Sequence, residues 1–275
     1  MNVSLCTITF RHHLHSLQEI TTWASDQGFN GIELWAVHAK NAIEDAAFHK
    51  KNMAEKGLAI SMLSDYLPLN QSVEQLIETT ERRANLLKLW GTNKLRTFAG
   101  QKASGEVTAE ERSHIVKQLQ AVCRSLAVHN QLLLIETHPN TLADTLESTL
   151  QLIEEVDHQA LRINYDALHM WEAGVDPAAG FIALEPYIEH VHLKNITSRD
   201  HLRVFAPENV YAAAGTREGM IPLFEGCIDY QRFFRLLSDS LEKVEVSLEW
   251  FGEDVFSVLT NDLRQLLKVN QRVGV

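Results

Sequence analysis

Eight short apolar runs recur along the whole chain, and their regular spacing is the feature that most constrains its fold. Each run consists mainly of aliphatic and β-branched residues and ends in polar or aromatic ones. This composition is typical of strands that are covered on both faces of a sheet. The runs cover residues 3–10, 31–35, 59–66, 94–100, 132–138, 161–169, 188–195 and 244–250.

Amphipathic stretches with helical spacing lie between these runs, and each precedes the next run. They cover residues 16–27, 72–90, 111–130 and 145–156. Gly28, Gly57 and Gly91 stand where helices should end, because glycine is favoured just past the last helical turn. The chain therefore alternates strands with helices.

Eight strands alternating with helices in roughly 250 residues is the expected size of a (β/α)8 barrel. We therefore predict an α/β fold with one TIM-barrel domain over residues 1–275. The main rival, a doubly wound open sheet, would need a glycine-rich phosphate loop after an early strand, and no run is followed by GxGxxG. The long segment 196–226 after the seventh run is expected to be a functional loop.

Composition excludes several classes of partner. The net charge of -11 at neutral pH argues against nucleic acid and against an anionic membrane. Cys6, Cys123 and Cys227 are widely spaced without a CxxC motif, which predicts reduced thiols. We see no secretion signal and no run near the roughly 18 apolar residues of a membrane span. We therefore expect a cytoplasmic protein, with its oligomeric state left open between monomer and homodimer.

The ends of the last four runs carry side chains that can bind metal: Glu136, Asp166, His192 and Glu249. In a parallel barrel the active site lies at the carboxyl ends of the strands. One such residue alone is more simply a cap, a salt-bridge partner or a core residue. Four at equivalent strand ends indicate a divalent cation, because three crowded carboxylates would otherwise repel each other. Their hard donors favour Mn²⁺ first, with Mg²⁺ or Co²⁺ as alternatives.

Two further polar side chains follow these ends at a spacing of two residues. His138 follows Glu136, and Lys194 follows His192. Because residues i and i+2 of a strand share a face, we expect both side chains to enter the barrel mouth. Pro139 cannot donate to a strand ladder, so the fifth strand should end there.

Longer sequence motifs support a more specific interpretation. They are SLCTITFRH, GIELW, SDYL, NKLRTFAGQK, ETHPNTLADTL, NVYAAAG, GMIPLFEG and SLEWFG. With these motifs the chain resembles the xylose isomerase-like barrel superfamily and, within it, the 3-dehydroshikimate dehydratases of petrobactin-type siderophore synthesis. The resemblance covers essentially the whole chain. It implies a hydro-lyase that converts 3-dehydroshikimate into protocatechuate (3,4-dihydroxybenzoate) by enolate formation and loss of water, for siderophore synthesis or aromatic-acid metabolism.

The resemblance also implies roles for individual residues. The metal would be held by the four strand-end residues named above, and His138 and Lys194 would act in catalysis. Arg96 in RTFAGQK and Tyr211 in NVYAAAG would hold the substrate. The further expected substrate contacts are His169, Phe205, Tyr66 and Glu33.

Elementary chemistry is compatible with these roles and also offers simpler ones. An unperturbed imidazole is half-deprotonated near pH 6.5, so His138 is a candidate base. Lys194 is a candidate positive donor, or alternatively an ion-pair partner of a rim carboxylate. Arg96 offers a planar fork for the substrate carboxylate, or alternatively a surface salt bridge. Tyr211 and Phe205 would cover the substrate ring, or simply pack the loop.

Three alternative functions remain. A sugar isomerase or epimerase of the same superfamily would use the same metal with a second carboxylate as the opposing acid or base. His138, placed two residues after Glu136, argues against it. A DNA-repair phosphodiesterase would bind several zinc ions and a polyanion, which the net charge disfavours. The third alternative, a non-enzymatic binding module, has no specific support in the sequence. We therefore expect an enzyme whose partner is a small-molecule substrate.

Overall fold

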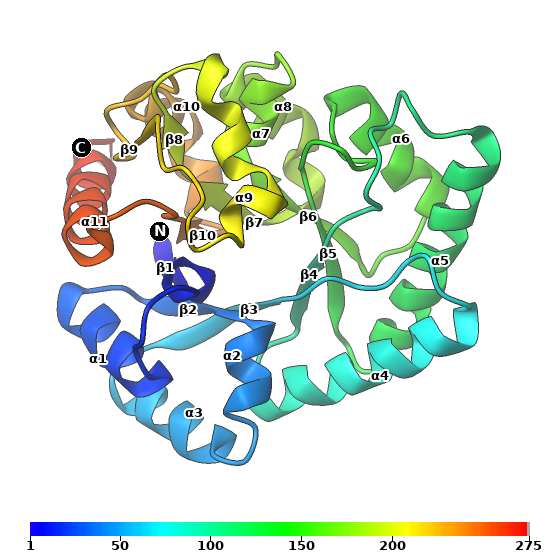
Figure 1. Ribbon diagram of the computed structural model, residues 1–275, viewed down its shortest axis with the longest axis horizontal. Helices are drawn as coiled ribbons and strands as arrows, with labels where there is room; N and C mark the ends of the chain where they lie inside the picture. Colours follow the sequence, from blue (N-terminus) through cyan, green and yellow to red (C-terminus); the bar gives the residue numbers. More distant parts are fainter. Residues whose placement is uncertain (274–275) are drawn as a thin grey trace.

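The computed structural model describes residues 1–273, and its eight long strands form a closed parallel barrel (Figure 1). The order around the barrel is β1-β10-β7-β6-β5-β4-β3-β2. The strands are β1 (Asn2–Cys6), β2 (Gly31–Trp35), β3 (Ala59–Ser64), β4 (Lys94–Thr97), β5 (Leu132–Glu136), β6 (Leu161–Asp166), β7 (Ile188–Leu193) and β10 (Glu245–Leu248). Each strand lies mainly within one predicted run, and the predicted (β/α)8 TIM barrel is confirmed.

Several strands end earlier than the apolar runs suggest. β6 ends at Asp166, because the Oδ1 atom of this residue accepts the backbone N–H groups of Leu168 and His169 and starts a helix. β5 ends at Glu136, and the N–H of His138 donates to the carbonyl of Ala143. The strands therefore stop where the polar side chains of the expected site begin.

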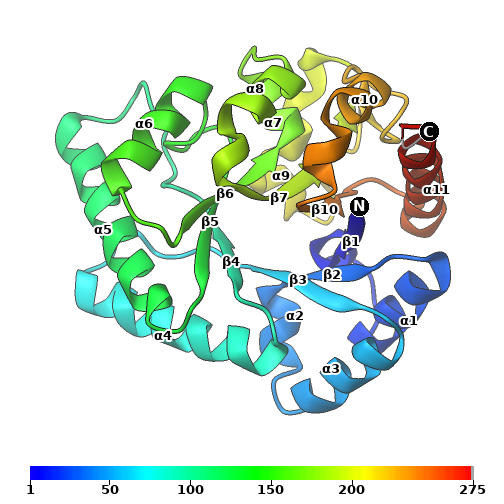
Figure 2. The ribbon, with the colours of Figure 1, turned by 180° about the vertical axis from the view of Figure 1, so that it is seen from behind.

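Helices surround the barrel on all sides (Figure 2). They are α1 (Leu17–Gln27), α2 (Ala36–Asn41), α3 (Ala46–Glu55), α4 (Val73–Trp90), α5 (Ala109–Ala127), α6 (Leu146–Val156), α7 (Ala167–Glu172), α8 (Pro177–Leu184), α9 (Pro207–Val210), α10 (Tyr230–Leu241) and α11 (Val255–Val273). The four helices predicted from amphipathic spacing are α1, α4, α5 and α6. Between residues 1 and 273, no helix combines the length and the apolar character that crossing a membrane requires.

Local sequence signals explain where the helices begin and end. The hydroxyl of Ser16 accepts the N–H of Glu19, and the carboxylate of Glu19 accepts the N–H of Ser16, so α1 starts with a capping box. α4 and α5 start in the same way. Gly28 and Gly91 end α1 and α4 with φ angles of 96° and 78°, a left-handed conformation that favours glycine.

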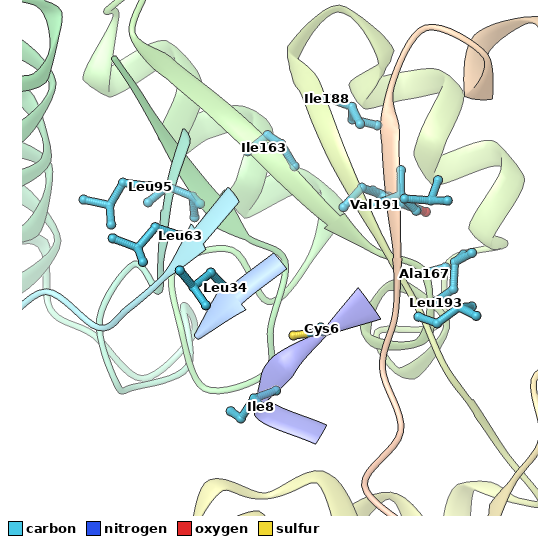
Figure 3. Packing of buried hydrophobic residues seen from close by; sticks show 14 of the residues in the cluster. Cys6, Ile8, Leu34, Leu63, Leu95, Ile163, Ala167, Ile188, Val191 and Leu193 are labelled. Carbon is cyan, nitrogen blue, oxygen red and sulfur yellow. The ribbon is translucent and has the colours of Figure 1, made fainter. Parts of the chain in front are cut away.

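The apolar core lies between the barrel and the helices (Figure 3). Leu34, Leu63, Leu95, Ile163 and Val191, each from a different strand, belong to this buried cluster. Because successive strand residues point to opposite faces, the neighbouring positions face the barrel interior. These inner positions are strongly polar in this chain. They include Glu33, Arg96, Glu136, Asn164, Asp166, His190, His192 and Ser247, all of which are buried.

The predicted functional loop is only partly irregular. It contains α9, and β8 (Asn195–Ile196) pairs antiparallel with β9 (Met220–Ile221). Figure 1 shows α9 in front of β7 and β10. The carbonyl of Val210 at the end of α9 accepts the Nε–H of Arg11, at 2.5 Å, and lies 3.1 Å from Nε2 of His12. The loop after β7 is therefore tied to the loop after β1.

Candidate active site

The four expected metal ligands lie together on adjacent strands. Glu136 ends β5, Asp166 ends β6, His192 lies near the end of β7, and Glu249 follows β10. Each offers one ligand atom, these atoms all lie within 4.8 Å of one another, and all four residues are buried. The strand register explains why the four residues converge. Asp166 of β6 pairs with His192, and on the other side His192 pairs with Ser247 of β10, two residues before Glu249.

One nitrogen of His192 faces the carboxylates. Its Nδ1 atom lies 3.4 Å from Oε1 of Glu136, 3.8 Å from Oδ2 of Asp166 and 3.5 Å from Oε1 of Glu249. Burial would lower the pKa of His192, but the carboxylates of Glu249, Glu33 and Glu136 outweigh burial and raise its pKa well above the usual value. The imidazole thus lies in a strongly negative environment.

Two of these carboxylates, Glu136 and Asp166, are kept ionised by their neighbours. Burial would raise the pKa of Glu136, but Arg96 and His192 hold it well below the usual value. Burial would also raise the pKa of Asp166, but the ammonium group of Lys194 outweighs burial and lowers this pKa. The Oε2 atom of Glu136 is buried without a hydrogen bond, although it lies 3.0 Å from Nε of Arg96. Ionised oxygen donors and one imidazole nitrogen fit the donor set of a divalent cation.

Lys194 lies between two of these carboxylates. Its Nζ atom is 2.5 Å from Oδ2 of Asp166 and 2.7 Å from Oε2 of Glu249. Burial would lower the pKa of Lys194, but Asp166 and Glu249 outweigh burial and raise it. The ammonium group also lies 5.5 Å from the ring centre of Phe205. Lys194 is therefore a buried cation, a position that suits both roles considered from the sequence.

His138 packs between two rings in the barrel mouth. Its ring centre lies 4.2 Å from that of Phe98 and 4.4 Å from that of His169. Nδ1 lies 2.8 Å from the carbonyl oxygen of Pro139. Because a carbonyl only accepts, Nδ1–H donates this bond and Nε2 is the nitrogen left to accept a proton.

The pKa of His138 differs from that of the unperturbed imidazole assumed from the sequence. Burial, reinforced by His169, lowers the pKa of His138 to about 3, far from the unperturbed value. The ring is therefore neutral throughout the physiological range. Its neighbour His169 is held by a hydrogen bond of 2.9 Å from Nδ1 to Oε2 of Glu172.

Arg96 lies beside the same group of residues on β4. Its guanidinium carbon is 5.1 Å from the ring centre of Tyr66 and 5.4 Å from that of Phe98. Nη1 of Arg96 is buried and has no hydrogen-bond partner. Burial would lower the pKa of Arg96, but Glu136 and Tyr66 outweigh burial and raise it. The residue is a fixed cation with an unused donor, rather than part of a surface salt bridge.

A small cavity joins most of the predicted site residues. Those that line it are Tyr66, Arg96, Glu136, His138, His169, Lys194, Phe205, Tyr211 and Glu249. Tyr211 donates a hydrogen bond of 3.0 Å from its hydroxyl to that of Tyr66, so the loops after β7 and β3 meet over the cavity. A larger cavity of about 500 Å³ lies next to it and shares Tyr66, Phe98, His138 and Tyr211.

Three predicted residues do not line this cavity: Glu33, Asp166 and His192. All three are completely buried. The expected substrate contact of Glu33 does not fit this placement, because its carboxylate faces His192 inside the barrel. Conversely, sequence reasoning missed Phe98 and Phe251, which do line the cavity. Their signal was position, since Phe98 directly follows the end of β4 and Phe251 lies three residues after the end of β10.

The fold and site define a class of protein, and comparison with known families agrees. The profile of the family described as xylose isomerase-like TIM barrel matches residues 22–270, and the chain belongs to this family.

Comparison with individual proteins is more specific. The chain is 46% identical over 279 residues to the 3-dehydroshikimate dehydratase of Bacillus anthracis, covering 99% of both proteins. It is similar, with a TM-score of 0.93, to the crystal structure of the probable 3-DHS dehydratase of petrobactin synthesis from Bacillus anthracis, covering 97% of this chain and 99% of that one. A solved L-ribulose 3-epimerase has a TM-score of 0.77 and 16% identity, covers 99% of this chain and 96% of that one, and shares the fold.

Proposed function

We propose that this chain is a metal-dependent 3-dehydroshikimate dehydratase, a hydro-lyase whose products are protocatechuate and water. The observation that carries this proposal is the 46% identity to a dehydratase of this name over 99% of the chain. The chemistry of the cavity supports it independently, because a guanidinium, a neutral imidazole and an ammonium group surround one small space. The product would serve catecholate siderophore synthesis or aromatic-acid metabolism.

Glu136, Asp166, His192 and Glu249 would hold the metal ion. Their three carboxylates and one imidazole favour Mn²⁺, with Mg²⁺ or Co²⁺ as alternatives. When bound, a divalent cation would supply Lewis-acid stabilisation of negative charge that develops next to it.

Arg96 would bind the carboxylate of the substrate. The unpartnered Nη1 supports this role, because a buried guanidinium nitrogen without an acceptor is costly unless a ligand supplies one. Phe205 and the hydrogen-bonded pair of Tyr66 and Tyr211 would enclose the ring and exclude water. His169, whose ring lies 4.4 Å from that of His138, would be a further contact.

His138 would remove the proton from the carbon beside the substrate ketone. Its Nε2 atom has a free lone pair, because Nδ1–H is bonded to Pro139. A pKa of about 3 makes this imidazole a weak base, so the step requires strong stabilisation of the negative charge that forms on the ketone oxygen. The buried ammonium of Lys194 contributes such stabilisation without any reorganisation of solvent.

The second half of the reaction expels the hydroxyl group from the next carbon. The electron pair left by the departing proton re-forms the ketone and a new carbon–carbon double bond, while the carbon–oxygen bond breaks. The leaving hydroxyl takes up a proton, for which Lys194 and protonated His138 are the donors in the cavity. One water is lost in total, and the ketone then tautomerises to the phenol of an aromatic ring.

A direct assay separates this function from its rival. Purified protein should generate the absorbance of protocatechuate from 3-dehydroshikimate. A sugar isomerase or epimerase of the same fold would instead interconvert ketoses and leave 3-dehydroshikimate untouched. Ketose interconversion without any protocatechuate would refute the proposal.

A further inference from the structure

Glu33 is a completely buried carboxylate that the mechanism above does not use. It lies on β2, which is separated from β7 by β1 and β10 around the barrel. Its side chain crosses the barrel interior, and Oε2 lies 2.9 Å from Nε2 of His192. A buried charge of this kind is costly unless it is paired and hydrogen-bonded, so its partners define what it does.

The contact decides which nitrogen of His192 is available to a ligand. A carboxylate can only accept, so Nε2–H of His192 donates to Glu33 and Nδ1 is the nitrogen on the other side of the ring. Nδ1 is also the atom that faces Glu136, Asp166 and Glu249, at 3.4 to 3.8 Å. The same ring therefore points one nitrogen at Glu33 and the other at the site that we assign to the metal.

Glu33 is itself held in place from other strands. The hydroxyl of Ser64 on β3 donates to its Oε1 atom, and Nε2 of His190 lies 3.5 Å from its Oε2 atom. Nε2 of His190 also lies 2.7 Å from the hydroxyl of Ser247 on β10. This polar network lies outside the lining of the cavity, so Glu33 is out of reach of a substrate there.

We infer that Glu33 is a positioning residue that fixes the ring orientation and tautomer of His192, so that Nδ1 is presented to the metal. This inference rests on the proposed function, because it presupposes the metal site of Glu136, Asp166, His192 and Glu249. Outer partners of this kind commonly contribute a factor of about 10 to 100 in metal affinity.

A second metal ion is the competing interpretation of the same cluster. Glu33, His190 and His192 also offer three ligand atoms within 4.8 Å of one another. Nε2 of His190 already contacts the hydroxyl of Ser247, and Oε2 of Glu33 already accepts the Nε2–H of His192. A second ion would also require His192 to lose its Nε2 proton. We therefore expect one ion for each chain.

The test measures binding of Mn²⁺ alone to chelator-stripped protein. Wild type should bind one Mn²⁺ per chain. Glu33→Gln keeps an acceptor oxygen but not its charge, and should weaken binding about tenfold. Glu33→Leu removes the acceptor and should weaken binding about 100-fold. Asp262→Asn is the matched control, because Asp262 is another buried carboxylate but accepts from the backbone of Leu223 instead, and should bind within twofold of wild type.

A spectroscopic measurement excludes a merely structural effect. NMR spectra of protein with ¹⁵N-labelled imidazoles show the Nε2–H resonances of the histidines. The resonance that is missing from the spectrum of His192→Gln is assigned to His192. This resonance should persist in Glu33→Gln and should be lost or shifted to the other tautomer in Glu33→Leu. If Glu33→Leu does not fold, the Mn²⁺ affinity of Glu33→Gln still tests the positioning role of Glu33.

The possible outcomes separate this inference from the proposed function. Wild type that binds no Mn²⁺ would overturn the metal site and the inference together. Wild type that binds Mn²⁺, with Glu33→Gln and Glu33→Leu unchanged in affinity and in the His192 resonance, would overturn the inference alone. Two ions per wild-type chain, falling to one in the Glu33 variants, would overturn it in favour of a second metal.

Discussion

Nζ of Lys194 lies 2.5 Å from Oδ2 of Asp166, so a buried ammonium contacts one of the carboxylates that we assign to the metal site. The ammonium and a divalent cation would therefore share negative charge. This relationship makes Lys194 the residue at which a catalytic role and a structural role are most easily confused, and the first prediction separates them.

Lys194→Met should bind Mn²⁺ at least as tightly as wild type, because a neighbouring positive charge is gone. Its kcat should fall by about 10²- to 10³-fold, since one preorganised charge no longer stabilises the enolate. Lys94→Met is a matched control: Lys94 pairs with Glu245 at 3.1 Å and Glu189 at 3.7 Å, and Lys94 and Glu245 begin their strands, at the opposite end of the barrel. A normal kcat in Lys194→Met would leave only the structural ion pair.

His138→Gln should retain the metal but lose turnover by about 10²- to 10⁴-fold, because the base is removed while the metal ligands stay. Mn²⁺ content and kcat, measured on the same preparation, check this. A variant that holds Mn²⁺ and turns over at close to the wild-type rate would remove His138 as the base.

Arg96→Lys should mainly raise KM. A lysine keeps a positive charge near Glu136, which lies 3.0 Å from Nε of Arg96, but it lacks the planar fork that binds a carboxylate. Loss of one charge-assisted hydrogen bond costs about 1.5–3 kcal/mol, or roughly a 10- to 150-fold rise in KM. Steady-state kinetics with 3-dehydroshikimate test this, and an unchanged KM would place the substrate carboxylate elsewhere.

Asp262→Asn should remove a pH dependence of stability. Burial raises the pKa of Asp262 to about 7, whereas in the unfolded chain it should be about 4. Between these values the folded protein holds one proton more than the unfolded chain, so the free energy of unfolding falls as pH rises from about 4 to 7, by about 4 kcal/mol at most. Asparagine cannot ionise and still offers an oxygen to the N–H of Leu223.

Urea unfolding at pH 5 and pH 8 gives the measurement. The gain of Asp262→Asn over wild type should be larger at pH 8 than at pH 5. An equal gain at both pH values would show that Asp262 is not held protonated by burial.

The barrel and the four metal-ligating candidates could be predicted from the sequence because both follow from short-range pattern. Strand residues alternate between two faces, and parallel strands end at the same rim. Glu136 and Asp166 could therefore be assigned to one place although they are 30 residues apart. The apolar pattern predicted strands that are too long. Asp166, for example, ends β6 and at the same time caps the following helix.

Contacts across the barrel could not be predicted in this way. Glu33 and His192 are 159 residues apart, and nothing in the alternation of β2 indicates which opposite strand its side chain meets. The pKa of His138 is equally a product of the assembled site, because it is set by burial and by the ring of His169. The Tyr66–Tyr211 hydrogen bond joins two loops whose paths no periodic signal describes.

Whether dehydration depends on the metal can be measured directly, as the formation of protocatechuate from 3-dehydroshikimate by chelator-stripped protein before and after addition of Mn²⁺. We expect no product from the stripped protein and restored turnover once Mn²⁺ is added. We also expect that Asp166→Asn, in a folded protein, is not restored by the same Mn²⁺ concentration. Full activity in the stripped protein, with metal content below one ion per hundred chains, would show that dehydration does not depend on a metal ion.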